Sequence, residues 1–157
     1  MKDCAPIPES VTETTSAAET EEAGERLCRA LLVRGLRHAV VALSGEMGVG
    51  KTAFARGFGR ALGATQVKSP TYTVVSEHKG VPVPLFHFDF YRLSDADDLA
   101  SIGYEDYLAR EGYLLVEWSE RLPDEIPADA VRVSILRAGD GDRRIIRIGE
   151  PYAHSRT

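Results

Sequence analysis

The glycine-rich segment at residues 45–52 constrains the fold of this 157-residue chain more than any other feature. It matches the P-loop pattern G-x-x-x-x-G-K-[ST] at every fixed position. A short apolar run at 38–43 precedes it, and a stretch with helical spacing at 51–62 follows it. The segment therefore predicts a buried strand, a loop that wraps phosphate groups, and a helix that starts at the end of the loop. The P-loop residues are Gly45, Glu46, Met47, Gly48, Val49, Gly50, Lys51 and Thr52.

The residue types of the P-loop suit a bound nucleotide. Several backbone N–H groups can turn toward one polyphosphate only where side chains have little bulk. The helix that follows adds its unpaired N-terminal donors. Lys51 supplies a cation for the β- and γ-phosphates, and the Thr52 hydroxyl is a ligand for Mg²⁺, which takes few protein ligands. All eight residues are predicted to contact the nucleotide.

Two carboxylates, Asp89 and Glu117, each end an apolar strand, at 84–89 and 113–117. In a parallel sheet such strand ends meet at the edge that carries the P-loop. A carboxylate there binds Mg²⁺ beside ATP, directly or through water, or orients an attacking water. The residues alone do not divide these roles. We favour Thr52 and Glu117 on the metal, with Asp89 beside it or acting as the catalytic acid.

The segment Ser69, Pro70, Thr71 and Tyr72 lies between the P-loop helix and the Asp89 strand. In P-loop proteins this position often holds a loop that responds to the γ-phosphate. The alternative is a tight loop whose hydroxyls bond nearby backbone groups.

Three further residues lie close in sequence to the two carboxylates. Trp118 is expected in the core, with a place beside the nucleotide or a partner as alternatives. His87 alternates with Asp89 on one strand face and is expected to be a hydrogen-bonded structural residue. Tyr91, followed by Arg92, either positions Asp89 or packs the strand end.

Strands that alternate with helices predict an α/β fold with a largely parallel sheet. We expect three layers, with the sheet flanked by helices as in P-loop NTPases, and a C-terminal β-hairpin. The length fits one domain at 16–149, after a mobile lead-in at 1–15 with a short edge strand and before a tail at 150–157. The remaining elements are helices at 18–34 and 95–110, the second interrupted at Gly103, a strand at 72–76, and hairpin strands at 131–136 and 144–148.

The composition limits the kinds of partner and the cellular compartment that are expected for this chain. The net charge of −5 argues against a DNA-binding or RNA-binding surface. No apolar run marks an export signal or a membrane span. Cys4 and Cys28 form neither a disulfide framework nor a zinc pattern. We expect a cytoplasmic protein.

Four segments together resemble the TsaE (YjeE) family, and the resemblance covers nearly all of residues 18–148. They are the P-loop and the segments 67–75, 87–92 and 115–118. Many proteins share the P-loop, whereas the other three segments in this order are more specific.

The resemblance implies a bacterial Mg²⁺-dependent ATPase that acts with TsaB and TsaD. Those partners transfer a threonylcarbamoyl group to the adenosine beside the anticodon in tRNAs that read codons beginning with adenine. Hydrolysis of ATP to ADP would reset or sustain the TsaB–TsaD complex, and tRNA would be a partner only indirectly.

The resemblance also assigns roles to single residues. The family usually has smaller residues where Met47 and Val49 stand, and we expect no effect because the loop contacts are made by the backbone. The implied roles are catalysis for Lys51, Asp89 and Glu117, metal binding for Thr52, Glu117 and Asp89, a place near the nucleotide for Trp118, and further ATP contacts for Thr20 and Arg143.

Other functions remain open from the sequence. A small-molecule kinase uses the same loop but needs a basic lid, and the arginine-rich hairpin is a poor lid. A regulatory GTPase is disfavoured because the chain has no Asn-Lys-x-Asp motif. A docking module that binds ATP without hydrolysing it is a third alternative.

Overall fold

The apolar runs of the sequence form the centre of the sheet. The computed structural model describes residues 7–68, 70 and 72–149. Strand β5 (Gly112–Glu117) lies between β2 (His38–Ser44) and β4 (Leu85–Asp89), and both pairings are parallel. All residues of β4 and β5 are buried, as expected for strands covered on both faces.

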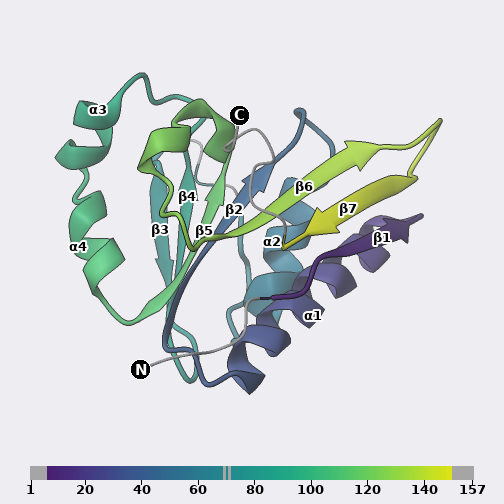
Figure 1. Ribbon diagram of the computed structural model, residues 1–157, viewed down its shortest axis with the longest axis horizontal. Coiled ribbons are helices and arrows are strands. Elements are labelled where there is room, and N and C mark those ends of the chain that lie inside the picture. Colours follow the sequence, from purple (N-terminus) through teal and green to yellow (C-terminus); the bar gives the residue numbers. More distant parts are fainter. Residues whose placement is uncertain (1–6, 69, 71, 150–157) are drawn as a thin grey trace.

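The complete sheet has seven strands in the order β1-β7-β6-β2-β5-β4-β3 (Figure 1). Its outer strands are β1 (Ser10–Thr14), β3 (Val75–His78), β6 (Val131–Arg137) and β7 (Arg144–Ile148). Only the central strands β6, β2, β5 and β4 run parallel; the pairs β1–β7, β6–β7 and β3–β4 are antiparallel. The expectation of a largely parallel sheet is therefore wrong only for the edge strands β1 and β3, since the antiparallel β6–β7 pair is the predicted C-terminal hairpin. Short connections join β3 to β4 and β6 to β7, and such connections can link only antiparallel neighbours.

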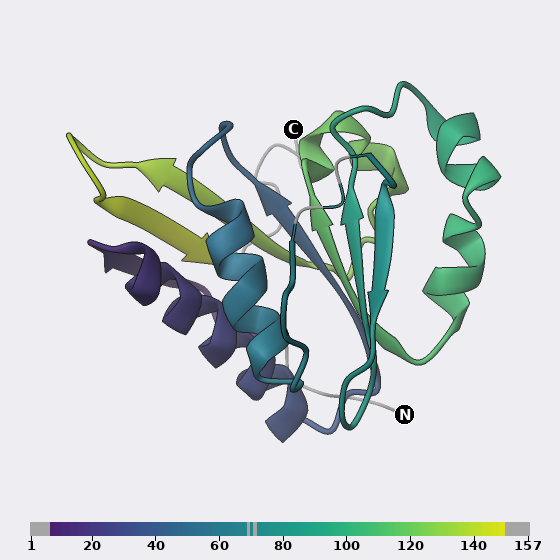
Figure 2. The same cartoon turned by 180° about the vertical axis from the view of Figure 1, so that it is seen from behind.

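Helices cover both faces of the sheet (Figures 1 and 2). On one face, α1 (Ala17–Val33) and α2 (Lys51–Arg60) pack over Val41 and Leu43 of β2. On the other, α3 (Ala96–Ser101) and α4 (Tyr104–Ala109) pack with Val40 and Ala42. Alternate residues of β2 thus belong to two separate hydrophobic cores, one on each face of the sheet. No helix within the described ranges is long and apolar enough to cross a membrane.

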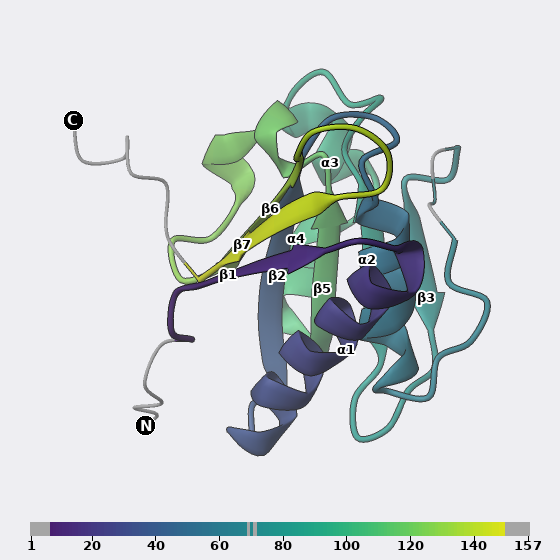
Figure 3. The same ribbon diagram turned by 90° about the vertical axis from the view of Figure 1, so that its right-hand side faces the viewer.

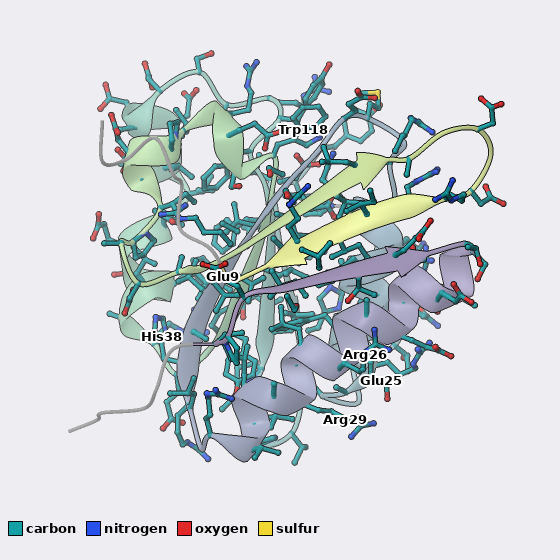
Figure 4. All side chains as sticks on the ribbon, turned by 45° about the vertical axis from the view of Figure 1, so that its right-hand side comes forward. Glu9, Glu25, Arg26, Arg29, His38 and Trp118 are labelled. Carbon is teal, nitrogen blue, oxygen red and sulfur yellow. The ribbon has the colours of Figure 1, made fainter. Side chains whose placement is uncertain are left out.

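The helices α1 and α2 touch through their backbones. A Cβ on Gly57 would lie 1.8 Å from the Glu21 carbonyl oxygen, and one on Gly24 would lie 2.1 Å from that of Phe54. Glu21 also bridges the two helices through an ion pair with Arg60, at 2.8 Å. Glu25 pairs with the same Arg60 and with Arg29 of α1, and Arg29 lies on the outer surface of α1 (Figure 4).

The sheet begins earlier in the chain than the predicted domain boundary at residue 16. Residues 10–14 form β1, which pairs with the whole of β7 from Ser10–Ile148 to Thr14–Arg144 (Figure 3). The short edge strand expected in the lead-in is therefore part of the sheet, and the lead-in is not mobile throughout. The termini at 1–6 and 150–157 lie outside the described residues.

The strand expected at 72–76 is displaced toward its C-terminal end, because β3 spans Val75–His78. Val74 adopts a left-handed backbone with φ of 70°, and its N–H donates to the Pro70 carbonyl at 2.7 Å. This turn keeps Tyr72 and Thr73 out of the sheet. The helix expected at 95–110 is broken at Gly103, as predicted, with φ of 80°. Two 3₁₀ turns, η1 (Ser119–Arg121) and η2 (Pro123–Glu125), follow β5.

Candidate active site

The P-loop connects the end of β2 to the first turn of α2 and has a backbone that only glycine adopts easily. Gly45, Gly48 and Gly50 have φ of 148°, 75° and 118°. A Cβ on Gly45 would lie 2.6 Å from the carbonyl oxygen of Ile135 in β6. The loop therefore lies directly against β6, and a side chain at residue 45 would push it away.

Two arginines of the β6–β7 hairpin hold the carbonyl groups of the P-loop. Arg144 Nε donates to the Val49 carbonyl at 2.7 Å, and Arg137 Nη2 donates to the carbonyls of Met47 and Gly48 at 3.4 and 3.3 Å. In a trans peptide the N–H points away from the C=O. These contacts thus turn the N–H groups of Gly48 and Gly50 to the side opposite the arginines. The late arginines were visible in the sequence, but their position behind the loop was not.

A cavity of about 470 Å³ lies between the P-loop and the carboxyl ends of β4 and β5. The register places Asp89 directly beside Glu117. The cavity therefore brings together predicted site residues from separate parts of the chain. Its lining residues are Met47, Gly48, Gly50, Lys51, Thr52, Asp89, Tyr91, Glu117 and Trp118.

Lys51 is a buried cation at the base of the cavity, with 5% of its surface exposed. Its ammonium group donates to the carbonyls of Gly45 and Glu46 at 2.5 and 2.9 Å. Burial lowers the pKa of Lys51, and nearby carboxylates, first Glu120 and then Glu117, oppose that shift. These carboxylates and carbonyls compensate the buried charge.

The two carboxylates are as buried as Lys51, with 3% of each residue exposed. The Tyr91 N–H donates to Asp89 Oδ1 at 2.9 Å. Glu117 Oε2 lies 2.7 Å from His87 Nε2. Each carboxylate is therefore held by a hydrogen bond from β4 or from the residues that directly follow it.

Trp118 has two environments. It packs partly against the core under α3 and α4, and it also lines the cavity. Its ring lies 4.1 Å from Lys51 Nζ and 4.9 Å from the centroid of the Tyr91 ring. Figure 4 shows Trp118 at the end of the sheet where the P-loop lies. The expectation of a core position is therefore correct only in part.

The match to a family model decides the family. The model described as "Threonylcarbamoyl adenosine biosynthesis protein TsaE" matches residues 14–145, which is most of the chain. The chain belongs to the TsaE family. The proteins of this family are named for their part in the biosynthesis of threonylcarbamoyladenosine in tRNA.

Curated members of the TsaE family have similar sequences. The proteins from Bacillus subtilis and Streptomyces coelicolor, both named tRNA threonylcarbamoyladenosine biosynthesis protein TsaE, are each 38% identical to this chain, over 107 and 121 residues. These matches cover 68% and 74% of this chain. The chain spans 66% of the length of the Bacillus subtilis relative and 78% of that from Streptomyces coelicolor.

A solved structure shares the fold. The crystal structure of YdiB from Bacillus subtilis aligns with a TM-score of 0.73 at 32% identity, and the alignment covers 90% of this chain and 84% of YdiB. The mixed α/β fold of this chain is therefore similar to that of a solved structure.

Some residues to which the TsaE resemblance gives a role do not line the cavity. Thr20 bonds the Thr14 hydroxyl at 2.9 Å, although its methyl group would lie 3.7 Å from a Cβ on Gly50. Arg143 pairs with Glu13 on the surface of the hairpin. In the P-loop itself, three residues predicted to contact the nucleotide do not line the cavity: Gly45, the exposed Glu46 and the buried Val49.

The segment at 69–72 is only partly described. Ser69 and Thr71 lie outside the described residues. Pro70 and Tyr72 line a separate cavity of about 390 Å³ beside β3. The role predicted for this segment therefore stays a prediction.

Two polar residues after β5 also support the P-loop, and sequence reasoning missed them. The Glu120 carboxylate accepts from the Gly45 N–H at 3.2 Å. The buried Ser119 hydroxyl donates to the Leu43 carbonyl at 2.9 Å, just before the loop. Their place directly after Glu117 and Trp118 was the available signal, because the residues after a parallel strand lie at the ligand-binding edge of the sheet.

The donor set of the cavity fits Mg²⁺. The side chains of Thr52, Asp89 and Glu117 offer the hard oxygen atoms that this cation prefers. Across the described residues, no group of three or more His, Cys, Asp or Glu side chains is arranged to hold a metal by itself. A cation here would need phosphate oxygens and water as additional ligands, which is the usual situation of Mg²⁺ at a nucleotide.

Proposed function

We propose that this chain is a Mg²⁺-dependent ATPase with the three-layer P-loop NTPase fold, and that it hydrolyses ATP to ADP in threonylcarbamoyladenosine biosynthesis. One observation carries the proposal. The cavity places the P-loop residues Lys51 and Thr52 opposite two buried carboxylates, Asp89 and Glu117. A cation, a hydroxyl, a glycine loop and two acids are the parts that hydrolysis of a nucleoside triphosphate requires.

Each part has a step in the reaction. The N–H groups of Gly48 and Gly50 and the ammonium group of Lys51 bind the phosphates. Thr52 and Glu117 would hold Mg²⁺, which, when bound, would neutralise the charge that develops on the phosphate oxygens. Asp89 orients a water molecule and receives its proton. The water oxygen bonds to the γ-phosphorus, the bond from that phosphorus to the β-phosphate oxygen breaks, and ADP and inorganic phosphate leave.

The hairpin contacts favour water over a metabolite as the acceptor of the phosphoryl group. A kinase needs a mobile basic lid, whereas Arg137 and Arg144 bond P-loop carbonyls and Arg143 pairs with Glu13. Arg137 and Arg144 thus support the loop from behind, and none of the three arginines lines the cavity. Phosphate transfer to a metabolite would favour the kinase.

TsaB and TsaD are the partners that the family implies, and tRNA would be contacted only through them. The described residues that line the cavity include no arginine. A second protein that inserts one would supply the group that typically adds about 10³–10⁵ to such rates. Cytoplasmic location follows from the same role.

We expect slow ATP turnover by the chain alone and a rise of at least about 10-fold when TsaB and TsaD are added, because the cavity lacks an arginine that stabilises the transition state. The measurement is phosphate release with and without the purified partners, run beside threonylcarbamoyl transfer to tRNA. Lys51→Ala mixed with the same partners controls for contaminating ATPases. A rate that the partners leave unchanged would remove this part of the proposal.

Arg144→Ala should weaken ATP binding about 10-fold. The substitution removes a hydrogen bond from a charged donor to the Val49 carbonyl, which contributes roughly 1.5 kcal/mol. Trp118 is the chain's one tryptophan and lines the cavity, so its fluorescence reports binding. Arg147→Ala, an exposed arginine on the same strand, is the matched control. Equal affinities in the two folded variants would show that the hairpin does not hold the loop.

A further inference from the structure

His87 is a polar residue in the middle of β4, a strand whose other residues before Asp89 are apolar. Its neighbours in β4 are Phe86 and Phe88, and its side chain has 0% of its surface exposed. It lies opposite Leu115, two register pairs before the pair formed by Asp89 and Glu117. An apolar residue would fit this position in the sheet without burying a polar ring.

One contact of the His87 ring explains its presence. His87 Nε2 lies 2.7 Å from Glu117 Oε2, and because a carboxylate oxygen accepts, the ring nitrogen carries the hydrogen. The other ring nitrogen, Nδ1, is buried and has no hydrogen-bond partner among the described residues. An orphaned buried atom is costly. The one hydrogen bond from His87 to Glu117 therefore offsets the cost of burying the ring.

The same contact matters more for Glu117 than for His87. A glutamate side chain has several rotatable bonds, and a carboxylate needs a hydrogen bond to stay in one orientation inside a cavity. His87 provides the one hydrogen bond that the described residues give the Glu117 side chain. It engages Oε2 and leaves Oε1 for another ligand.

We propose that His87 is a positioning residue that orients the Glu117 carboxylate for binding of Mg²⁺ at the nucleotide. The inference rests on the proposed function, because it takes Glu117 as a metal ligand. Partners that orient metal ligands typically change metal affinity by about 10–100-fold when they are removed. His87 itself does not line the cavity.

The test compares two substitutions of similar size. His87→Gln keeps an N–H donor at about the reach of Nε2, whereas His87→Met fills the site without a donor. Affinity for Mn²⁺, a paramagnetic substitute for Mg²⁺, is measured by electron paramagnetic resonance on protein saturated with ADP. We expect His87→Met to weaken Mn²⁺ binding about 10–100-fold and His87→Gln to retain most of it. Affinity for ADP in EDTA should be equal in all three proteins.

A double substitution separates positioning from packing. In a Glu117→Gln background, His87→Met should cause no further loss of Mn²⁺ affinity, because the carboxylate that it orients is gone. This comparison also decides the matter if His87→Gln does not fold. Unchanged Mn²⁺ affinity in folded His87→Met, or an equal loss in both backgrounds, would overturn the inference. Failure of the unsubstituted chain to bind ADP would instead contradict the proposed function.

Discussion

Lys51→Ala should lower ATP turnover by about 10²–10³-fold, which is the typical cost of removing one group that stabilises developing charge in a transition state. Lys51 is the cation at the base of the cavity, and its ammonium group already lies within the P-loop, bonded to the Gly45 and Glu46 carbonyls. Binding of a triphosphate would exchange those carbonyls for phosphate oxygens. Without the cation, the buried acids Asp89 and Glu117 would repel the phosphates.

Calorimetry is the suitable binding measurement for Lys51 variants, because the ammonium group contacts the Trp118 ring and its removal is expected to change the fluorescence of the protein without nucleotide. Lys51→Met keeps the apolar stem and tests whether the effect comes from charge or from packing. We expect it to lose turnover as Lys51→Ala does while it keeps the thermal stability of the parent. Lys79→Ala removes an exposed lysine remote from the cavity and is the matched control. Normal turnover in either Lys51 variant would contradict the proposed role of the P-loop.

Asp89→Asn and Glu117→Gln should each lower turnover by about 10²–10⁴-fold with ATP binding retained. Each amide matches the carboxylate in shape but lacks the charge that binds Mg²⁺ or receives a proton. The two variants should differ in their response to metal. If Glu117 is the metal ligand, Glu117→Gln should weaken Mn²⁺ binding. Asp89→Asn should leave Mn²⁺ binding nearly unchanged but lose the hydrolysis step.

The same pair of variants tests the docking module, in which ATP only stabilises a surface. In that case both would keep threonylcarbamoyl transfer with TsaB and TsaD at the level of the parent chain. Glu120→Gln is a useful comparison, because Glu120 bonds the Gly45 N–H but does not line the cavity. Its loss should affect the shape of the loop more than the reaction. Full transfer activity in both Asp89→Asn and Glu117→Gln would contradict the proposed ATPase and favour the docking module.

Local pattern was sufficient for the strand, loop and helix around Gly45–Thr52 and for the break at Gly103. It was also sufficient to place Asp89 and Glu117 side by side, because the carboxyl ends of parallel strands meet at one edge. Whether these residues act as proposed remains a prediction.

Long-range contacts account for what the sequence did not show. The start of β3 was misplaced because Tyr72 and Thr73 favour a strand, while the Val74–Pro70 bond makes a turn there. The arginines looked alike in the sequence, yet Arg144 holds the P-loop and Arg143 pairs with Glu13. Which one faces the loop depends on strand register and on the packing of β6 and β7, and spacing alone does not reveal that.

The backbone contact at Gly24 and Gly57 has a mechanical consequence. No layer of side chains lies between α1 and α2 there, so the helices cannot slide or repack independently. The chain of contacts is also closed: α2 meets α1, α1 follows β1, β1 pairs with β7, and Arg144 of β7 returns to Val49 beside α2. We therefore expect a shift of the P-loop to be felt through Arg144 and β7 at the edge strand β1.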